Sequence, residues 1–100
     1  MIAVAGRLQF NPEDRQAVLD GLHEVVRHSR QDPGCIDYWW SEDIDAPDAF
    51  RFFECWESQE LMDAHMAQPH TEEFMKRCVS RVTGVEAYAY QVSVRRPAAG

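Results

Sequence analysis

The sequence predicts one α+β domain, covering residues 1–100, with the ferredoxin-like order βαββαβ and an antiparallel four-stranded sheet. Three observations lead to this prediction. Apolar residues alternate with a period of two near both ends of the chain, two segments repeat them every three to four positions, and a central segment is apolar on both faces. With 100 residues, 45% of them hydrophobic, the chain can build one core, which we place at residues 2–94, followed by a tail at 95–100.

Residues 2–10 are expected to form the first strand, because apolar side chains stand at almost every second position. A helix should follow, since Asn11 offers an oxygen to cap it and Pro12 suits the first helical position. Apolar residues spaced by three and four continue to about Ser29. The segment Asp32-Pro33-Gly34 then predicts a turn.

The centre of the chain is expected to hold two neighbouring strands, residues 35–40 and 49–57, joined by an acidic, solvated loop at 43–48. The second of these strands carries large apolar groups on both faces, whereas a strand with one face in water alternates apolar and polar residues. Helices can cover only one face of the sheet. The other face therefore predicts a partner, and we expect a second copy of the chain related by a two-fold axis.

Helical periodicity returns after the third strand. Ser58 can cap a short helix that runs to about Gln68, where Pro69 interrupts it. Thr71 can cap a further helix. Residues 85–94 alternate again and are expected to form the fourth strand.

Composition narrows the classes of partner and compartment. The formal net charge of −7 argues against binding to nucleic acid or to anionic membranes. Three cysteines without C-x-x-C spacing indicate neither a disulfide framework nor a zinc knuckle and fit a reducing cytosol. No apolar segment is long enough to span a bilayer, and the N-terminus lacks the features of a signal peptide. We therefore expect a cytoplasmic protein.

Several motifs occur along the chain in a recognisable order. They are Pro33-Gly34-Cys35, Tyr38, the segment 53–58 (FECWES), the segment 65–70 (HMAQPH) and Phe74. Together they resemble the antibiotic biosynthesis monooxygenase family across the predicted core. The resemblance implies a dimeric α+β barrel. Members of this family include cofactor-independent monooxygenases of quinols and polyketide aromatics, haem-degrading enzymes, isomerase-like relatives and proteins without known activity.

Cofactor signatures are absent from the sequence. The haem-degrading branch of the family carries an Asn on the first strand, a Trp on the second helical segment and a His further along. The nearest positions here hold Gly6, His65 and Met75, which argues against haem degradation. The sequence also has neither a G-x-G-x-x-G motif nor a P-loop, so we expect no flavin or nucleotide cofactor.

His65 is the candidate catalytic residue. On its helix it shares a face with Leu61 and points toward the sheet. An imidazole in that place can act as a general base on a phenolic or enolic proton near neutral pH. The alternative is a core histidine whose ring is satisfied by a backbone carbonyl or by Glu54. Glu54 in turn can orient His65 or can pair with Arg7 or Arg51.

Six further residues are candidates for substrate binding: Tyr38, Trp40, Phe53, Trp56, His70 and Phe74. Their rings can wall a pocket for a flat aromatic ligand. Alternatively, the aromatic rings fill the core and the dimer interface. His65 and His70 are five positions apart and would diverge by about 140° on a continuous helix, so we expect no metal site.

The resemblance and an inward-facing histidine among aromatic residues favour an oxidoreductase: a cofactor-independent monooxygenase acting on a quinol or anthrone-like substrate with O2. In this interpretation His65 assists deprotonation, and the resulting carbanion reduces O2 directly. Two alternatives stay open. One is a non-catalytic dimeric module that binds a small ligand or serves in a stress response, and the other is an isomerase of small hydroxy-ketones.

Overall fold

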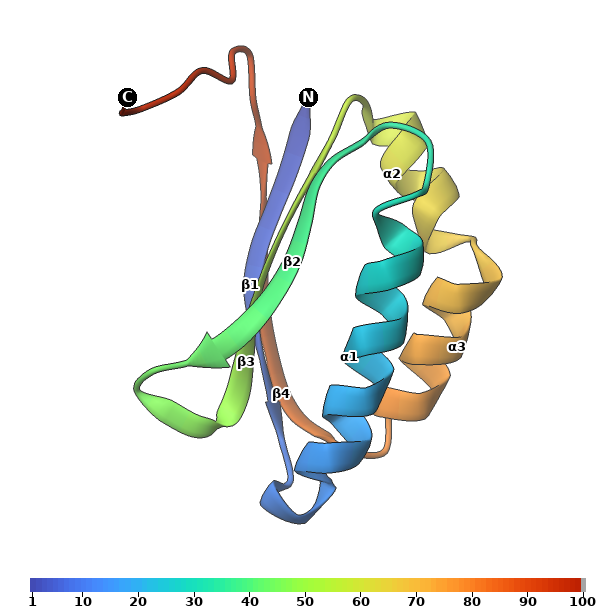
Figure 1. Ribbon diagram of the computed structural model, residues 1–100, viewed down its shortest axis with the longest axis vertical. Coiled ribbons are helices and arrows are strands. Elements are labelled where there is room, and N and C mark those ends of the chain that lie inside the picture. Colours follow the sequence, from blue (N-terminus) through green and yellow to red (C-terminus); the bar gives the residue numbers. More distant parts are fainter. Residues whose placement is uncertain (100) are drawn as a thin grey trace.

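A computed structural model describes residues 1–99 and has the predicted βαββαβ order (Figure 1). The elements are β1 Ile2–Phe10, the 3-10 turn η1 Pro12–Asp14, α1 Arg15–Ser29, β2 Cys35–Asp43, β3 Ala46–Trp56, α2 Gln59–Met66, α3 Pro69–Cys78 and β4 Val82–Gln91. The ferredoxin-like α+β fold class is therefore confirmed. Among residues 1–99, no helix combines the length and the apolar character needed to cross a membrane.

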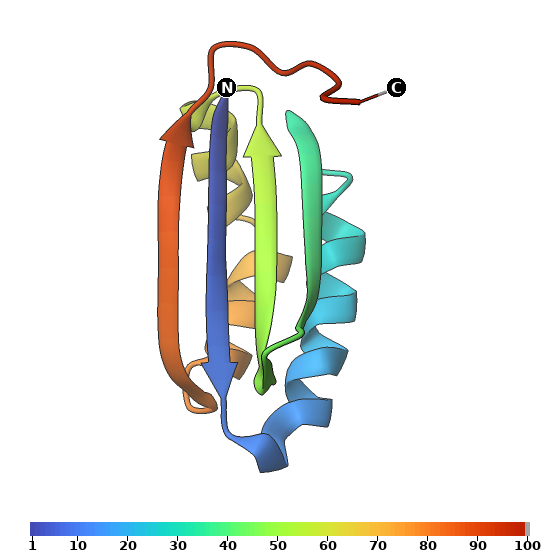
Figure 2. The same ribbon diagram turned by 90° about the vertical axis from the view of Figure 1, so that its left-hand side faces the viewer.

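The four strands form one antiparallel sheet in the order β2-β3-β1-β4, and the helices lie on one of its faces (Figure 1, Figure 2). Gly6 interrupts the apolar alternation of β1 for a steric reason. A Cβ at this position would lie 2.5 Å from the carbonyl oxygen of Glu86 and 2.6 Å from Cζ of Phe52. The ring of Phe52 therefore occupies the space that a side chain of β1 would fill.

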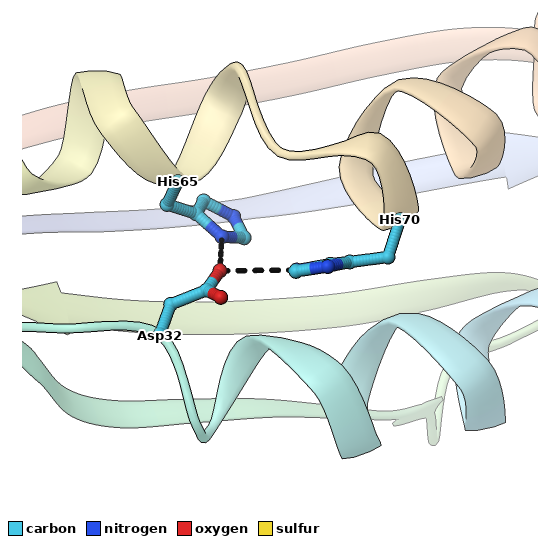
Figure 3. A group of neighbouring side chains, drawn as sticks. All are labelled: Asp32, His65 and His70. Atoms are coloured by element: carbon cyan, nitrogen blue, oxygen red, sulfur yellow. Dashed lines mark hydrogen bonds and ion pairs between the residues drawn. The ribbon is translucent and has the colours of Figure 1, made fainter.

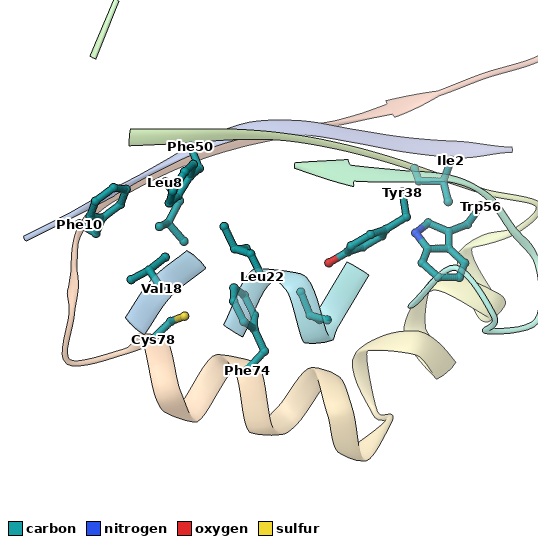
Figure 4. Packing of buried hydrophobic residues seen from close by; sticks show 11 residues of the cluster. Ile2, Leu8, Phe10, Val18, Leu22, Tyr38, Phe50, Trp56, Phe74 and Cys78 are labelled. Carbon is teal, nitrogen blue, oxygen red and sulfur yellow. The ribbon is translucent and has the colours of Figure 1, made fainter. Parts of the chain in front are cut away.

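The core lies between the sheet and the helices (Figure 4). Phe10 and Phe50 stack with their ring centroids 4.8 Å apart, and Trp56 is completely buried. Burying a large apolar side chain contributes about 1.5–3 kcal/mol, so this cluster supplies the main force that holds the helices on the sheet. Its members are Ile2, Leu8, Phe10, Val18, Leu22, Val25, Tyr38, Phe50, Trp56, Phe74 and Cys78.

The first α-helix begins later than predicted. Pro12–Asp14 form the 3-10 turn, and Asn11 makes no side-chain cap hydrogen bond, so the predicted cap is wrong. The backbone of Asn11 is engaged instead. Its N–H donates to the carbonyl of Arg81 at 3.0 Å, and its carbonyl accepts from the N–H of Asp14 at 2.8 Å. These bonds tie the end of β1 to the chain just before β4 and tighten the turn.

The acidic segment between β2 and β3 is a tight hairpin, so the loop predicted at 43–48 is too long: only Ile44 and Asp45 form the turn, and they are exposed as expected. β2 continues to Asp43 and β3 already begins at Ala46. The carboxylate of Asp43 is buried. It accepts from Nε of Arg7 at 3.0 Å, Nε of Arg51 at 3.1 Å and the N–H of Asp45 at 2.9 Å, and these bonds offset the cost of burying its charge. The backbone N–H of Asp45, together with the two guanidinium groups, holds the pKa of Asp43 below its usual range.

The connection between α2 and α3 follows the prediction in part. Oγ of Ser58 caps α2 by accepting from the N–H of Leu61 at 3.2 Å, as expected. Pro69 separates the two helices, but it is itself the first residue of α3, where no backbone N–H is needed. Thr71 is buried in the first turn of α3, and Gln68 holds the cap position, so the predicted cap at Thr71 is wrong.

The fourth strand is shifted toward the N-terminus, from the predicted 85–94 to Val82–Gln91. Gly84, which marked a break in the sequence pattern, pairs with Gln9 of β1. Beyond a register shift between Gln9 and Phe10, the pairing continues with Phe10 opposite Val82. The strand therefore begins before the glycine rather than after it.

The sheet face away from the helices carries an apolar row across all four strands; we call it the open face. In register, Trp39 pairs with Phe53, Phe53 with Ala5, and Ala5 with Tyr88. Trp39 is 43% exposed and Tyr88 is 59% exposed. No element within residues 1–99 covers this face (Figure 1). The second copy expected to cover it stays a prediction.

Candidate active site

His65 lies in the last turn of α2 with its ring against the sheet, as helical spacing predicts. The residue is 2% exposed. Its ring stacks on Trp56 with the centroids 4.4 Å apart, and the ring of Tyr38 meets it edge-on at 5.5 Å. Trp56 ends β3 and Tyr38 lies in β2, so two strands and one helix surround the imidazole.

Asp32 joins His65 to His70 (Figure 3). Oδ2 of Asp32 lies 2.8 Å from Nδ1 of His65 and 3.0 Å from Nε2 of His70. We call these three residues the Asp–His cluster. The hydroxyl of Thr71 approaches the same nitrogen of His65 at 3.5 Å. The sequence pattern placed Asp32 only in a turn and did not indicate this role, although an acidic residue directly before the Pro-Gly-Cys motif was an available signal.

The turn between α1 and β2 carries Asp32 toward α2. Gly34 in this turn has a φ of 81°, and a Cβ there would lie 2.4 Å from Cδ1 of Leu61. Glycine alone accepts both this backbone conformation and so close an approach. The N–H of Glu57 also donates to the carbonyl of Gly34 at 2.9 Å, which fastens the turn to the end of β3.

The break between α2 and α3 brings His65 and His70 together. α2 ends at Met66 and α3 begins at Pro69, so the rotation of a continuous helix does not separate the two rings. Their centroids lie 6.1 Å apart. The divergence of about 140° that a continuous helix would impose therefore does not apply, because Pro69 interrupts the helix as predicted and begins a second one.

The cluster indicates where His65 carries its proton. An ionised carboxylate only accepts hydrogen bonds, so Nδ1 of His65 and Nε2 of His70 both donate to Asp32. A neutral imidazole then leaves Nε2 of His65 with a free lone pair. Within residues 1–99, no group forms a hydrogen bond to that nitrogen. The site thus contains a nitrogen with a free lone pair, Nε2 of His65, among aromatic rings, and the carboxylate of Asp32 binds the other nitrogen of the same imidazole.

Glu54 supports the ring on which His65 stacks. The two arginines considered as its partners bind Asp43 on the opposite face of the sheet, so that predicted pairing is wrong. Oε1 of Glu54 instead accepts from Nε1 of Trp56 at 3.0 Å. Burial raises the pKa of Glu54, and the Trp56 hydrogen bond and, when His65 is protonated, its positive charge offset part of this rise.

An aromatic wall runs from His65 toward α3. The hydroxyl of Tyr38 accepts from Nε1 of Trp40 at 3.3 Å, and Trp40 meets Phe74 edge-on at 5.9 Å. Burial raises the pKa of Tyr38 to about 12. The phenol is therefore neutral near pH 7 and can donate a hydrogen bond.

Two open grooves flank this region. One, of about 760 Å³, lies between α1 and β2 and includes Trp40 in its lining. The other, of about 810 Å³, lies between α1 and α3 and includes His70 and Phe74. His65 lines neither groove.

Comparison with family models matches residues 1–77 to the family described as antibiotic biosynthesis monooxygenase. The chain belongs to the antibiotic biosynthesis monooxygenase family. The matched segment runs from β1 into α3 and contains all three residues of the Asp–His cluster.

The chain covers different fractions of the known proteins that it resembles. An uncharacterized Synechocystis protein, sll1783, is 32% identical over 76 residues, which are 76% of this chain and 52% of that protein. The chain thus spans about half the length of that relative. YcnE of Bacillus subtilis, named as a candidate monooxygenase, is 26% identical over 77 residues, which are 77% of this chain and 81% of YcnE. A crystal structure of a candidate antibiotic biosynthesis monooxygenase from Deinococcus radiodurans has a TM-score of 0.90 and 26% identity, with 100% of both chains covered.

In this family member the six predicted substrate-binding residues do not share one pocket. Tyr38 and Trp56 enclose His65, while Trp40, His70 and Phe74 reach the two grooves. Phe53 lies on the open face, where it stacks on Trp39 with the centroids 5.8 Å apart. Phe53 can therefore meet a ligand only on that side of the sheet.

Proposed function

We propose that this antibiotic biosynthesis monooxygenase family member is a cofactor-independent monooxygenase of a small hydroxylated aromatic, such as a quinol or an anthrone-like compound. The observation that carries the proposal is the hydrogen bond from Nδ1 of His65 to Asp32, which leaves Nε2 as a base among aromatic rings. Family membership supports the reaction class. The rings of Tyr38 and Trp56 support an aromatic substrate, since such rings pack well against one another.

With an anthrone-like substrate, Nε2 of His65 removes a proton and leaves a carbanion. The carbanion gives its electron pair to O2, and the new carbon–oxygen bond produces a peroxide anion. The imidazolium of His65 returns the proton to the peroxide. Loss of water then leaves a carbonyl group on the substrate, so the substrate supplies the electrons and no other reductant is consumed.

Asp32 is a positioning residue in this reaction. Its carboxylate holds the proton of His65 on Nδ1, so Nε2 keeps its lone pair. The same carboxylate stabilises the imidazolium that forms when His65 accepts the substrate proton.

The groove between α1 and α3 is the proposed route to the site. His70 lines this groove, and its side chain is 18% exposed, whereas the side chain of His65 is 1% exposed. His70 is therefore the member of the Asp–His cluster that an entering ligand meets first. Its ring would have to move aside before the ligand reaches His65, while Phe74 offers the ligand an apolar contact.

Oxygen uptake tests the proposal. Metal-stripped wild type and His65→Ala are compared on a panel of quinols and anthrones, each against its autoxidation without protein. We expect uptake above this background for wild type and a loss of at least about 100-fold in His65→Ala, which removes the base. Circular dichroism establishes that the variant is folded. Wild-type uptake at the background rate across the whole panel contradicts the proposal.

The burial of His65 favours one alternative function. A ring 2% exposed with one nitrogen bonded to a carboxylate is also suited to a structural role in a non-catalytic, ligand-binding or stress-response module. Quenching of tryptophan fluorescence by an aromatic ligand, without turnover, would indicate that module. An isomerase of small hydroxy-ketones would use the same base and would keep its activity without O2.

A second copy of the chain is the proposed partner of the open face. Trp39, Phe53 and Tyr88 form a continuous apolar row there, and about half of the Trp39 and Tyr88 surface is exposed to solvent. A two-fold axis would place the same row of each copy against the other.

A further inference from the structure

The Asp–His cluster has the donor set of a metal site. It offers two imidazole nitrogens and one carboxylate oxygen, all within 4.8 Å of one another. Two histidines and one carboxylate, with other positions open to water, are a recurrent site for divalent transition metals. We propose that Asp32, His65 and His70 bind one divalent transition-metal ion and that the bound ion blocks His65 as a base. The blocking rests on the proposed function, whereas the binding does not.

Distances within the cluster are close to those around a coordinated ion. Protein nitrogen and oxygen ligands lie about 2.0–2.2 Å from such a metal, so two ligands at right angles are about 3 Å apart. Oδ2 of Asp32 already lies 2.8 Å from the ligand nitrogen of His65 and 3.0 Å from that of His70. An ion would therefore replace two existing hydrogen bonds, and only the two rings need to come closer to each other.

The surroundings of the cluster also suit a bound cation. The side chain of His65 is 1% exposed and that of Asp32 is 9% exposed, while His70 leaves an entrance from the groove. The hydroxyl of Thr71, 3.5 Å from Nδ1 of His65, is placed to bond a water molecule on the metal. The net charge of −7 attracts cations at long range.

Metal binding changes where His65 carries its proton. A neutral imidazole has one N–H, which in the metal-free cluster is on Nδ1 and faces Asp32. A metal on Nδ1 displaces this proton to Nε2. Nε2 can then donate a hydrogen bond but can no longer accept a proton from a substrate. The contact that prepares His65 as a base thus also makes it sensitive to a metal.

Calorimetric titration of chelator-treated protein with Zn²⁺ and with Co²⁺ measures the binding directly. We expect one ion per chain in wild type and at least about tenfold weaker binding in His70→Gln and in Asp32→Asn, because each variant loses a ligand. His70→Gln alters a part-exposed ring, so it keeps the test valid if Asp32→Asn does not fold.

Two control variants address other binding sites. His23→Gln removes an exposed histidine of α1 that does not stack on His70, and Cys35→Ser removes the least buried thiol. Both controls should bind as wild type does. Three results would overturn the metal site: no binding to wild type, binding to both ligand variants as tight as to wild type, or loss of binding in either control. The three residues would then form a hydrogen-bonded cluster only.

Measurements of oxygen uptake test separately whether the bound ion prevents His65 from acting as a base. Zn²⁺ at concentrations that fill the site should abolish the His65-dependent uptake of wild type, and His70→Gln should need about tenfold more. Binding without inhibition overturns the blocking alone. If metal-free protein shows no uptake at all, the proposed function fails, while the calorimetric result still decides the metal site.

Discussion

Among single residues, Asp32 carries the clearest expectation for the proposed reaction. Asp32→Asn keeps the shape of the side chain, but its amide can donate to Nδ1 of His65 and so favour the tautomer with the proton on Nε2. We expect kcat for O2 uptake to fall by at least about 100-fold and KM to change much less. Asp32→Glu keeps the carboxylate and should recover part of kcat. Equal losses in the two variants would contradict a role through the charge of Asp32.

Glu54 is expected to make stability depend on pH. Burial raises its pKa in the folded protein, so the folded state holds the proton more tightly than the unfolded state does. This contribution to the free energy of unfolding is present below the unfolded pKa of about 4.3 and is lost as the pH rises through the folded value. Glu54→Gln does not titrate. Urea unfolding at a series of pH values should therefore show the variant gaining stability relative to wild type as the pH rises above the unfolded pKa of about 4.3. A constant difference would contradict the burial cost.

Side chains could be placed from the sequence where a short period governs them. Helical spacing correctly turned His65 toward the sheet. The alternation of side chains along a strand also indicates the partner of Glu54. Trp56 lies two positions later and shares its face of the sheet, whereas Arg51 lies three positions earlier and does not. Asp32 had no such signal, since its contact with His65 spans 33 positions and depends on the turn between them.

At the scale of elements, Gly34 couples the turn after α1 to α2. Gly34→Ala should lower the free energy of unfolding by about 1–3 kcal/mol, because alanine disfavours a φ of 81° and its Cβ would overlap Leu61. Urea unfolding measures the loss. Gly84→Ala is the control, since its φ is not positive and its Cβ would meet only the flexible side chain of Gln9 at 3.1 Å. Equal losses in the two variants would contradict a special requirement at Gly34.

Periodicity found the strands and helices of the fold, but tertiary contacts set their ends. The hairpin between β2 and β3 was missed because Asp43 is neutralised by Arg7, 36 positions away on β1, and by Arg51 on β3. The approach of His65 and His70 was missed because Pro69 starts a new helix, whose direction the sequence does not specify. In both cases the deciding interaction lies between elements rather than within one.

For the whole molecule, the sequence indicated an uncovered apolar face, and the structure shows where it is. Apolar residues on both sides of β3 were the signal, and the row from Trp39 through Phe53 to Tyr88 is the result. The sequence of one chain indicates that the row is covered but does not identify the molecule that covers it. A stable interface buries about 800 Å² on each partner, which needs most of a sheet face rather than an edge.

Self-association through the open face can be tested with a charge in the centre of the row. Wild type should behave as a dimer in sizing chromatography with light scattering at micromolar concentration, and Phe53→Glu should be a monomer, because a dimer would bury its carboxylate without a partner. Val79→Glu is the matched control: it adds the same charge at a side chain that is 76% exposed at the end of α3, and it should remain a dimer. A monomeric wild type, or equal dissociation of both variants, would contradict the two-fold partner.

Phe53→Leu separates the two roles predicted for this residue, dimer contact and substrate binding. It keeps the face apolar and should preserve the dimer, so any loss of substrate affinity would come from the missing ring.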